Sequence, residues 1–526
     1  MSTVDHSADD RAQLHRLGYA QELFRSMGGF QNFAISFTII SILAGCLTSY
    51  YIAFNQGGPV AITWGWLIVG LFCTFVALAL AEIASTYPTA GGLYYWASRL
   101  GSPAWGWFTG WFNLIGQIAV TAAIGWGCAL FMTSLLNLLW DYPTSYGWIY
   151  FLYGMILLGA GLINMFKVSI TAFMNTISAW WHMVGVLFIV FVLVIVPDHH
   201  QSFSYVFGQT LNNTGFGGQS WTHGVFIYVF LTGFLMAQYT ITGYDASAHM
   251  SEETRQASLG AAWGIVMSVV VSVIFGFALL VAVTFAIPST KGAVDAGIYP
   301  VTYIWEASMS RRWAELLLFV AVVAQSFCTI ASVTSASRMM FAFSRDRAVP
   351  GHQLWKRVSK ADRVPVYTVW AICCLAFVLT VPTLWFGYTG YAASTAVAVI
   401  GLYIAFVLPI ILRLRAGERF ERGAWSLGRH YKWIDWIAIL WIGFISLVFF
   451  APFAYAGIPW NTGFDWNLFN YTLVMVGGAF VLFGGWYLLS ARKWFKGPIR
   501  QGDEAELERI EREFGEGTSP APAPAA

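Results

Sequence analysis

Long apolar runs alternate with short polar segments along almost the whole chain. Each run holds about 20 or more mostly apolar residues, enough for an α-helix to cross the ~30 Å hydrocarbon core of a bilayer. Twelve such runs are predicted, at residues 30–54, 59–81, 104–136, 148–166, 170–196, 222–250, 259–287, 313–343, 366–386, 391–412, 436–455 and 466–489. The pattern therefore predicts an all-α membrane protein with twelve transmembrane helices.

The composition supports this interpretation. Of the 526 residues, 58% are hydrophobic and only 10% are charged, whereas a soluble domain carries about 25% charged residues. The lipid bilayer is thus the expected surrounding, and a net charge of +2 without a basic patch argues against a nucleic-acid partner. The six cysteines lie in apolar runs without zinc-like spacing, so no metal site, cofactor or disulfide framework is predicted.

The basic residues predict the orientation. If the first run enters the membrane from the cytoplasm, 24 of the 28 Lys and Arg residues fall in cytoplasmic segments. Lys291, Arg311 and Arg312 fall outside, and Arg338 lies within the eighth run. Because Lys and Arg are retained on the cytoplasmic side, both termini are expected there, in a multi-pass protein of the plasma membrane. Residues 1–29 lack a cleavable signal peptide, so the first run is expected to act as both signal and span.

Two of the runs contain residues that a continuous lipid-facing helix disfavours. The first has Ser41, Gly45 and Thr48 at mid-depth, and the sixth has Gly243 and Asp245 among hydroxyl residues. Unwound backbone at membrane depth is tolerated where protein or a water-filled cavity satisfies its polar groups. The exposed half-helix ends carry partial charges that can bind a carboxylate or a cation. Small residues also mark ordinary helix contacts, but breaks at matching places indicate a transporter binding site.

Three stretches resemble a known family. Residues 81–96 read AEIASTYPTAGGLYYW, residues 243–254 read GYDASAHMSEET, and residues 335–346 begin SASR and end FAFSRD. The chain resembles the amino acid–polyamine–organocation superfamily of permeases, and more narrowly its amino acid/choline transporter branch. The similarity runs from about residue 18 to about residue 493.

This resemblance implies two inverted five-helix repeats with broken helices one and six, plus two extra helices, working by alternating access. The segments expected are a cytoplasmic N-terminal segment (1–29), a first repeat (30–196), an extracytoplasmic loop (197–221) and a second repeat (222–412). A cytoplasmic loop with the last two spans (413–489) and a cytoplasmic, partly disordered tail (490–526) follow.

The resemblance also implies the site residues. The stretch Leu43, Ala44 and Gly45 matches the glycine-rich break that binds the substrate carboxylate, with Leu43 in place of a usual glycine. Tyr239 matches an aromatic residue that covers the substrate, and the break beside it spans residues 240–243. The substrate-binding residues expected are Ser41, Leu43, Ala44, Gly45, Cys46, Tyr239, Thr240, Thr242 and Gly243.

Four further residues are candidates for coupling or gating. Asp245 matches an acidic gate position of relatives, or else pairs structurally at the helix end. His182 lies where some proton-coupled relatives carry lysine, and its pKa near 6.5 suits proton exchange; the alternative is a neutral histidine at a helix contact. Ser332 and Ser335 match hydroxyl ligands of sodium-coupled members. The coupling ion is therefore expected to be H⁺ or Na⁺.

The leading hypothesis is a secondary transporter for an amino acid or a related small zwitterion such as 4-aminobutyrate. A choline or polyamine permease of the same fold is the alternative, although choline has no carboxylate to pair with the N–H groups. An integral membrane enzyme or a channel is a different class, and the chain offers no HExxH motif, no paired carboxylates within spans and no Walker A motif. A monomer or weak homo-oligomer is expected.

Overall fold

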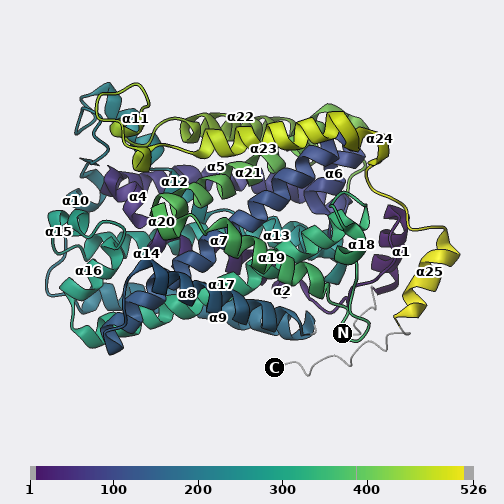
Figure 1. Ribbon diagram of the computed structural model, residues 1–526, viewed down its shortest axis with the longest axis horizontal. Coiled ribbons are helices and arrows are strands. Elements are labelled where there is room, and N and C mark those ends of the chain that lie inside the picture. Colours follow the sequence, from purple (N-terminus) through teal and green to yellow (C-terminus); the bar gives the residue numbers. More distant parts are fainter. Residues whose placement is uncertain (1–6, 167, 387, 515–526) are drawn as a thin grey trace.

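The helices of this protein run side by side along one long axis (Figure 1). The computed structural model describes residues 7–166, 168–386 and 388–514. Within these residues, 11 helices are long and apolar enough to cross a membrane, and a shorter apolar helical segment covers Gly224–Thr240. Together they account for the twelve predicted spans, so the predicted all-α membrane fold is confirmed.

The spans follow the predicted order along the chain. The first consists of α2 (Gly29–Ile40), α3 (Ile42–Thr48) and α4 (Tyr50–Asn55), and the next four are α5 (Pro59–Thr86), α7 (Pro103–Trp140), α8 (Tyr146–Asn164) and α9 (Val168–Ile195). The sixth consists of α11 (Gly224–Thr232), α12 (Leu235–Thr240) and α13 (Ala246–His249), followed by α14 (Ala257–Phe285) and α17 (Arg311–Arg345). The last four are α19 (Val366–Leu379) with α20 (Thr383–Phe386), α21 (Tyr388–Ala416), α22 (Tyr431–Phe450) and α23 (Thr472–Trp486), which continues through η6 (Tyr487–Ala491) into α24 (Arg492–Trp494).

Short elements connect the spans. They include α1 (Ser7–Leu17), α6 (Gly92–Leu100), α10 (Phe203–Gly208), α15 (Thr290–Asp295), α16 (Pro300–Ser308), α18 (His352–Trp355), α25 (Glu504–Glu513), η1 (Ser251–Glu253) and four further 3₁₀ turns. Two-residue strands β1 (Gln56–Gly57) and β2 (Leu211–Asn212) pair in antiparallel orientation. The boundaries predicted for the repeats and the segments between them stay predictions.

Two predicted boundaries near the C-terminus are wrong by several residues. The eleventh span ends at Phe450 rather than 455, and the twelfth begins at Thr472 rather than 466. The intervening segment contains Trp460 and Trp466, which are exposed. Tryptophan is favoured at membrane interfaces, so the aromatic residues of the loop blur the ends of the two helices that it joins.

The first span breaks at Ser41. This residue has φ 35° and ψ 79°, in the left-handed region, and it separates α2 from α3. The backbone N–H groups of Ala44 and Gly45 donate to the Ser41 carbonyl, each at 2.8 Å. The predicted break is confirmed, but its expected position at residues 43–45 is wrong, because these residues form the first turn of α3.

The sixth span breaks where the sequence predicted it. Helix α12 ends at Thr240, residues 241–245 are not helical, and α13 begins at Ala246. Gly243 has φ +103°, which is disfavoured for residues with a Cβ atom. A Cβ at this position would also lie 2.3 Å from Cγ2 of Ile39, the penultimate residue of α2. Glycine therefore permits both the turn and its close packing against the other broken span.

Both terminal helices lie at the same end of the bundle (Figure 1). His15 on α1 contacts Glu504 and Glu511 on α25, each at 2.7 Å. This arrangement is what an even number of crossings requires. Residues 1–6 and 515–526 lie outside the described part of the chain, so the partial disorder expected in the tail (490–526) stays a prediction.

A buried carboxylate joins three distant segments at this α1–α25 end. Asp346, directly after α17, accepts hydrogen bonds from the hydroxyl groups of Tyr19 and Tyr94 and from the backbone N–H of Ile499. The distances are 2.7, 3.0 and 2.9 Å, respectively. The N-terminal segment, helix α6 and the C-terminal segment are thereby fastened to the end of α17.

Three buried arginine–glutamate pairs strengthen the same end. They explain why the motifs around residues 82, 252 and 345 carry charges in an otherwise apolar chain. Removing one partner of a buried pair leaves an uncompensated charge, which costs about 3–5 kcal/mol. The N···O distances are 2.8 Å for Arg413–Glu82, 2.8 Å for Arg345–Glu252 and 2.9 Å for Arg338–Glu253.

Candidate functional site

A small cavity lies between the two broken spans, halfway along the bundle. Its volume is about 10 Å³, room for about one water molecule. Helices α2 and α3 form one side, α12 and Thr242 the second, and α7 the third. The lining residues are Ile39, Ile40, Ala44, Gly45, Val120, Ile124, Tyr239, Thr240 and Thr242.

Gly45 sets how closely the two broken spans approach each other. A Cβ atom at Gly45 would lie 2.6 Å from both Oγ1 and Cγ2 of Thr240. Real side chains do not pack this closely, so any larger residue at position 45 must push α3 and α12 apart. Helices in membranes use small residues in this way to bring their backbones together.

His182 on α9 supports the first break. Its Nδ1 lies 2.8 Å from the Ser178 carbonyl and its Nε2 lies 2.7 Å from the Ser41 hydroxyl. A carbonyl can only accept, so Nδ1 carries the proton, and Nε2 of the neutral ring accepts from Ser41. Both ring nitrogens are thus satisfied in a neutral histidine that holds Ser41 in its left-handed conformation. Proton exchange by His182 stays a prediction.

The structure brings together five of the nine residues expected to bind substrate. Ala44, Gly45, Tyr239, Thr240 and Thr242 line the cavity. The other four are buried beside it, where they shape the wall without lining it. These are Ser41 at the break, Leu43 and Cys46 on α3, and Gly243 in the second break.

Helix α7 completes the cavity, which the sequence did not indicate. Val120 and Ile124 line it, and Asn113 and Gln117 lie on the same face of α7 one and two turns away. Apolar residues in a span give no signal that separates a lipid-facing position from a cavity wall. The two amides, which are unusual in a membrane helix, are a signal that sequence reasoning could have used.

Asp245 ends the second break and is fully buried. Its Oδ2 accepts from the side-chain amides of Asn113 at 3.2 Å and Gln117 at 2.9 Å. The same oxygen lies 3.3 Å from Nε2 of His249, one turn further along α13. The predicted gate residue thus sits in a polar cluster next to the cavity, and His249 is a member that the sequence analysis missed.

The two candidate sodium ligands lie on α17, away from the lining of the cavity. Ser332 donates to the Cys328 carbonyl at 2.9 Å, as serine often does inside a helix. The Ser335 hydroxyl is buried and finds no hydrogen-bond partner among the described residues. No group of three or more His, Cys, Asp or Glu side chains suited to a metal occurs in the described ranges. A role for either serine in ion coupling stays a prediction.

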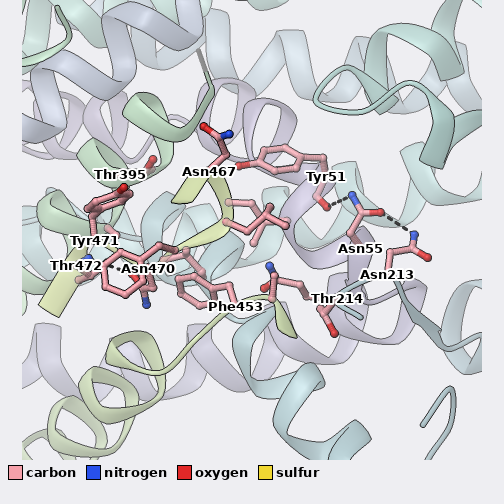
Figure 2. A pocket seen from close by; sticks show the side chains of 17 residues that line it. Tyr51, Asn55, Asn213, Thr214, Thr395, Phe453, Asn467, Asn470, Tyr471 and Thr472 are labelled. Carbon is pink, nitrogen blue, oxygen red and sulfur yellow. Dashed lines mark hydrogen bonds between the residues drawn. The ribbon is translucent and has the colours of Figure 1, made fainter. Parts of the chain in front are cut away.

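A larger cavity of about 400 Å³ lies at the end of the bundle opposite α1 and α25. We call it the vestibule. Helix α12 lines both cavities, through Leu235 in the vestibule and Tyr239 and Thr240 in the small cavity, whereas α4 lines the vestibule and the α22–α23 loop forms its rim. Figure 2 shows amide and hydroxyl groups around this space, including Asn55, whose side chain accepts from Asn213 at 2.8 Å.

The vestibule is polar but carries no formal charge. Its polar lining residues are Tyr51, Asn55, Gln56, Asn213, Thr214, Thr395, Asn467, Asn470, Tyr471 and Thr472, and its apolar ones include Ile52, Leu235 and Phe453. No Asp, Glu, Lys, Arg or His belongs to the lining that the structure describes. Such a surface can hydrogen-bond a polar solute without selecting for a net charge of either sign.

Comparison with known proteins agrees with this architecture. The family model described as "Amino acid permease" matches residues 27–480. The amino-acid permease BAT1 of Arabidopsis thaliana is 37% identical over 93% of this chain and 96% of its own length. Its homolog in Oryza sativa is also 37% identical, over 94% of this chain and 96% of its own length. The GABA-specific permease of Saccharomyces cerevisiae is 27% identical, over 94% of this chain and 86% of its own length.

Proposed function

The chain belongs to the amino acid permease family, and on this premise we propose that it carries 4-aminobutyrate or another small zwitterionic amino acid across the plasma membrane. As a family member it is a membrane transporter for amino acids rather than an enzyme. The identity of the solute, the coupling ion and the cytoplasmic location of both termini are the parts that we propose.

The cavity between the two breaks carries this proposal. In the first turn of α3, the N–H groups of Ile42 and Leu43 cannot reach a carbonyl of their own helix. These groups favour a carboxylate, whereas the carbonyl end of α12 favours an amine. A molecule with both groups, separated by a short apolar chain, fits the chemistry of the two ends.

Two further observations favour a zwitterion over choline or a polyamine. The vestibule is lined by neutral polar groups, which can hydrogen-bond a zwitterion and provide no carboxylate that would attract a cation. Choline and putrescine carry no carboxylate and would leave the N–H groups of α3 without a partner. The similarity to a GABA-specific permease is compatible with 4-aminobutyrate, while the more similar relatives are named only as amino-acid permeases.

The transport cycle follows from the size of the cavity. A volume of about 10 Å³ holds no amino acid, so a solute enters only when α3 and α12 move away from α7. Tyr239 lines the cavity and would then close over the bound solute. Opening alternately towards the vestibule and towards the α1–α25 end gives alternating access, with H⁺ or Na⁺ as the driving ion. We propose that the chain does this as a monomer or weak homo-oligomer.

Counterflow in proteoliposomes tests the proposal. Vesicles containing the full-length protein are preloaded with unlabelled solute and then given the labelled one, for 4-aminobutyrate, a panel of amino acids, choline and putrescine. We expect saturable counterflow of 4-aminobutyrate or another zwitterion. Counterflow of choline or putrescine alone would refute the zwitterion, and flux without counterflow would indicate a channel.

A further inference from the structure

The hydrogen bonds of His249 fix one of its two protons. Its Nδ1 lies 2.9 Å from the carbonyl oxygen of Ala90, in the loop before α6. A carbonyl oxygen only accepts, so Nδ1 must carry a hydrogen whatever the charge of the ring. In the neutral ring, Nε2 is therefore a bare acceptor.

This acceptor faces a carboxylate. Nε2 of His249 lies 3.3 Å from Oδ2 of Asp245, an ion-pair contact, and it makes no hydrogen bond within the described ranges. If His249 were neutral and Asp245 ionised, two lone pairs would face each other in a site without exposure to water. One additional proton removes this repulsion, on either the imidazole or the carboxyl group.

Other groups do not replace that proton. Asn113 and Gln117 donate to Oδ2 but carry no charge, and Oδ1 of Asp245 has no hydrogen-bond partner among the residues described. A buried carboxylate held by amides alone keeps a large desolvation penalty. The partly satisfied carboxylate therefore needs a positive charge or a proton close by.

Within the described chain, the elements packed against α13 offer no buried cation without a partner, and Arg99 of α6 is exposed. Helices α2 and α14, like α7 on the other side of Asp245, contain no Asp, Glu, His, Lys or Arg. The arginines of α17 near this end are paired with the glutamates of η1. The titratable groups around the cluster are Tyr244 and Tyr403, Tyr94, Tyr95 and Arg99 of α6, Arg338 with Glu253, and Arg345 with Glu252.

The cluster is continuous with the cavity. Asp245 closes the break that begins after Thr240, and Gln117 lies one turn along α7 from the cavity-lining Val120. The pair has no net charge with the extra proton and a charge of −1 without it. Loss of the proton would thus drive Asp245 and His249 apart directly beside the second break, where movement changes the cavity.

We propose that Asp245 and His249 hold one exchangeable proton between Oδ2 and Nε2, and that this pair is the proton site that couples transport to a proton gradient. The inference rests on the proposed transport function and adds to it the identity of the ion and its binding site. One proton enters with each solute and leaves on the opposite side, so proton and solute cross in a 1:1 ratio.

The test uses the full-length protein in proteoliposomes with a trapped pH-sensitive dye. The solute is 4-aminobutyrate, or the panel member with the greatest counterflow. In His249→Asn the shorter amide can still donate to the Ala90 carbonyl. We expect this variant to lose solute-driven proton entry. Its accumulation of solute under a proton gradient should fall about tenfold, since couplings between two sites span about 5–150-fold. Counterflow, which needs no net proton movement, should stay within about twofold.

Asp245→Asn is the second variant, for the case that His249→Asn folds poorly. It keeps the hydrogen bond between His249 and the Ala90 carbonyl. It should likewise transport without moving protons. His200→Gln is the matched control, because His200 also contacts a carbonyl oxygen, that of Leu193 at 2.8 Å, but lies outside the cluster. Its proton coupling should equal that of the unmodified protein.

Three results would overturn the inference. The first is proton entry that is undiminished in both variants. The second is a loss of counterflow in parallel with proton entry in both variants. The third is accumulation by the unmodified protein that follows a sodium gradient without proton movement. Absence of counterflow for every solute by the unmodified protein would instead refute the transport function itself, which keeps the two failures distinct.

Discussion

Gly45 and Thr240 are in such close contact that the Cβ atom of an alanine at position 45 would lie 2.6 Å from the threonine hydroxyl oxygen. These residues belong to different broken spans, and both line the cavity. The width of the site is therefore set by the absence of one side chain.

Gly45→Leu should abolish uptake while the protein still reaches the membrane, because the bulky side chain forces α3 and α12 apart. Gly45→Ala should reduce uptake, and adding Thr240→Ala should restore part of it by removing two of the three clashing atoms. A double-mutant cycle of uptake rates measures this coupling, expected at about 0.5–3 kcal/mol. Gly478→Ala, at a position with open space around it, is the control. Normal uptake by Gly45→Leu would refute the assignment of the site.

Ser41 should tolerate glycine better than alanine. Both substitutions remove the hydrogen bond to His182 and leave a buried ring nitrogen unsatisfied, which costs about 1–3 kcal/mol. Glycine also relieves the left-handed backbone, which is worth about 1–2 kcal/mol. Thermal unfolding in detergent should therefore rank wild type above Ser41→Gly and Ser41→Gly above Ser41→Ala. Equal stability of the two variants would show that the conformation at the break carries no strain.

The pair Arg413–Glu82 offers a test of the α1–α25 end. Arg413→Met leaves the Glu82 carboxylate buried without its partner, and this should cost about 3–5 kcal/mol. The double variant Arg413→Met/Glu82→Gln should recover most of the loss, since the amide oxygen can still accept from the Leu427 N–H. Melting temperature and yield from membranes are the measurements. Arg422→Met is the control. Arg422 lies 3.3 Å from Glu418 in an exposed ion pair, so its loss should change stability by less than about 1 kcal/mol.

The contact between α1 and α25 should depend on pH. Burial lowers the pKa of His15, but hydrogen bonds to Glu504 and Glu511 raise it more, so the pKa is raised from its ordinary value of 6.5. The stabilisation from His15 is then complete below pH 6.5 and is lost as pH rises through the raised pKa.

Glu511 acts in the opposite direction. Burial raises its pKa, but the Gln21 N–H, His15 and Arg11 lower it more, to below its ordinary value of 4.5. Its contribution is present above pH 4.5 and is lost as pH falls through the lowered pKa. Hydrogen exchange of α25 should thus be slowest between about pH 4.5 and 6.5, after correction for intrinsic rates. His15→Gln should remove the change on the alkaline side, and an unchanged profile would contradict the contact.

The sequence predicted the helices well because lipid imposes long apolar runs. It placed the second break correctly since Gly243 is required by the backbone itself, with φ +103°. It misplaced the first break because Gly45 marks close packing against Thr240, whereas the turn is made by Ser41 with the help of His182. That contact joins residues 141 positions apart, and no local pattern reveals it.

The proton pair was missed for a similar reason. His249 lies at the end of a span and is followed by Glu252 and Glu253, and a histidine at such a position is usually an ordinary polar residue of the span's end. Its relation to Asp245 follows from the single turn of α13, but its relation to the Ala90 carbonyl depends on a loop 159 positions away. Only the two contacts together determine where the protons must lie.

The contacts of Asp346 bear on the turnover rate of transport. Because Tyr19 and Ile499 both donate hydrogen bonds to Asp346, we expect the cavity to open at that side only after these two hydrogen bonds break. The turnover rate would then depend on Tyr19, Asp346 and Ile499, which do not line the cavity. A change in the N-terminal or C-terminal segment at these contacts would then alter the rate of transport without altering which solute is transported.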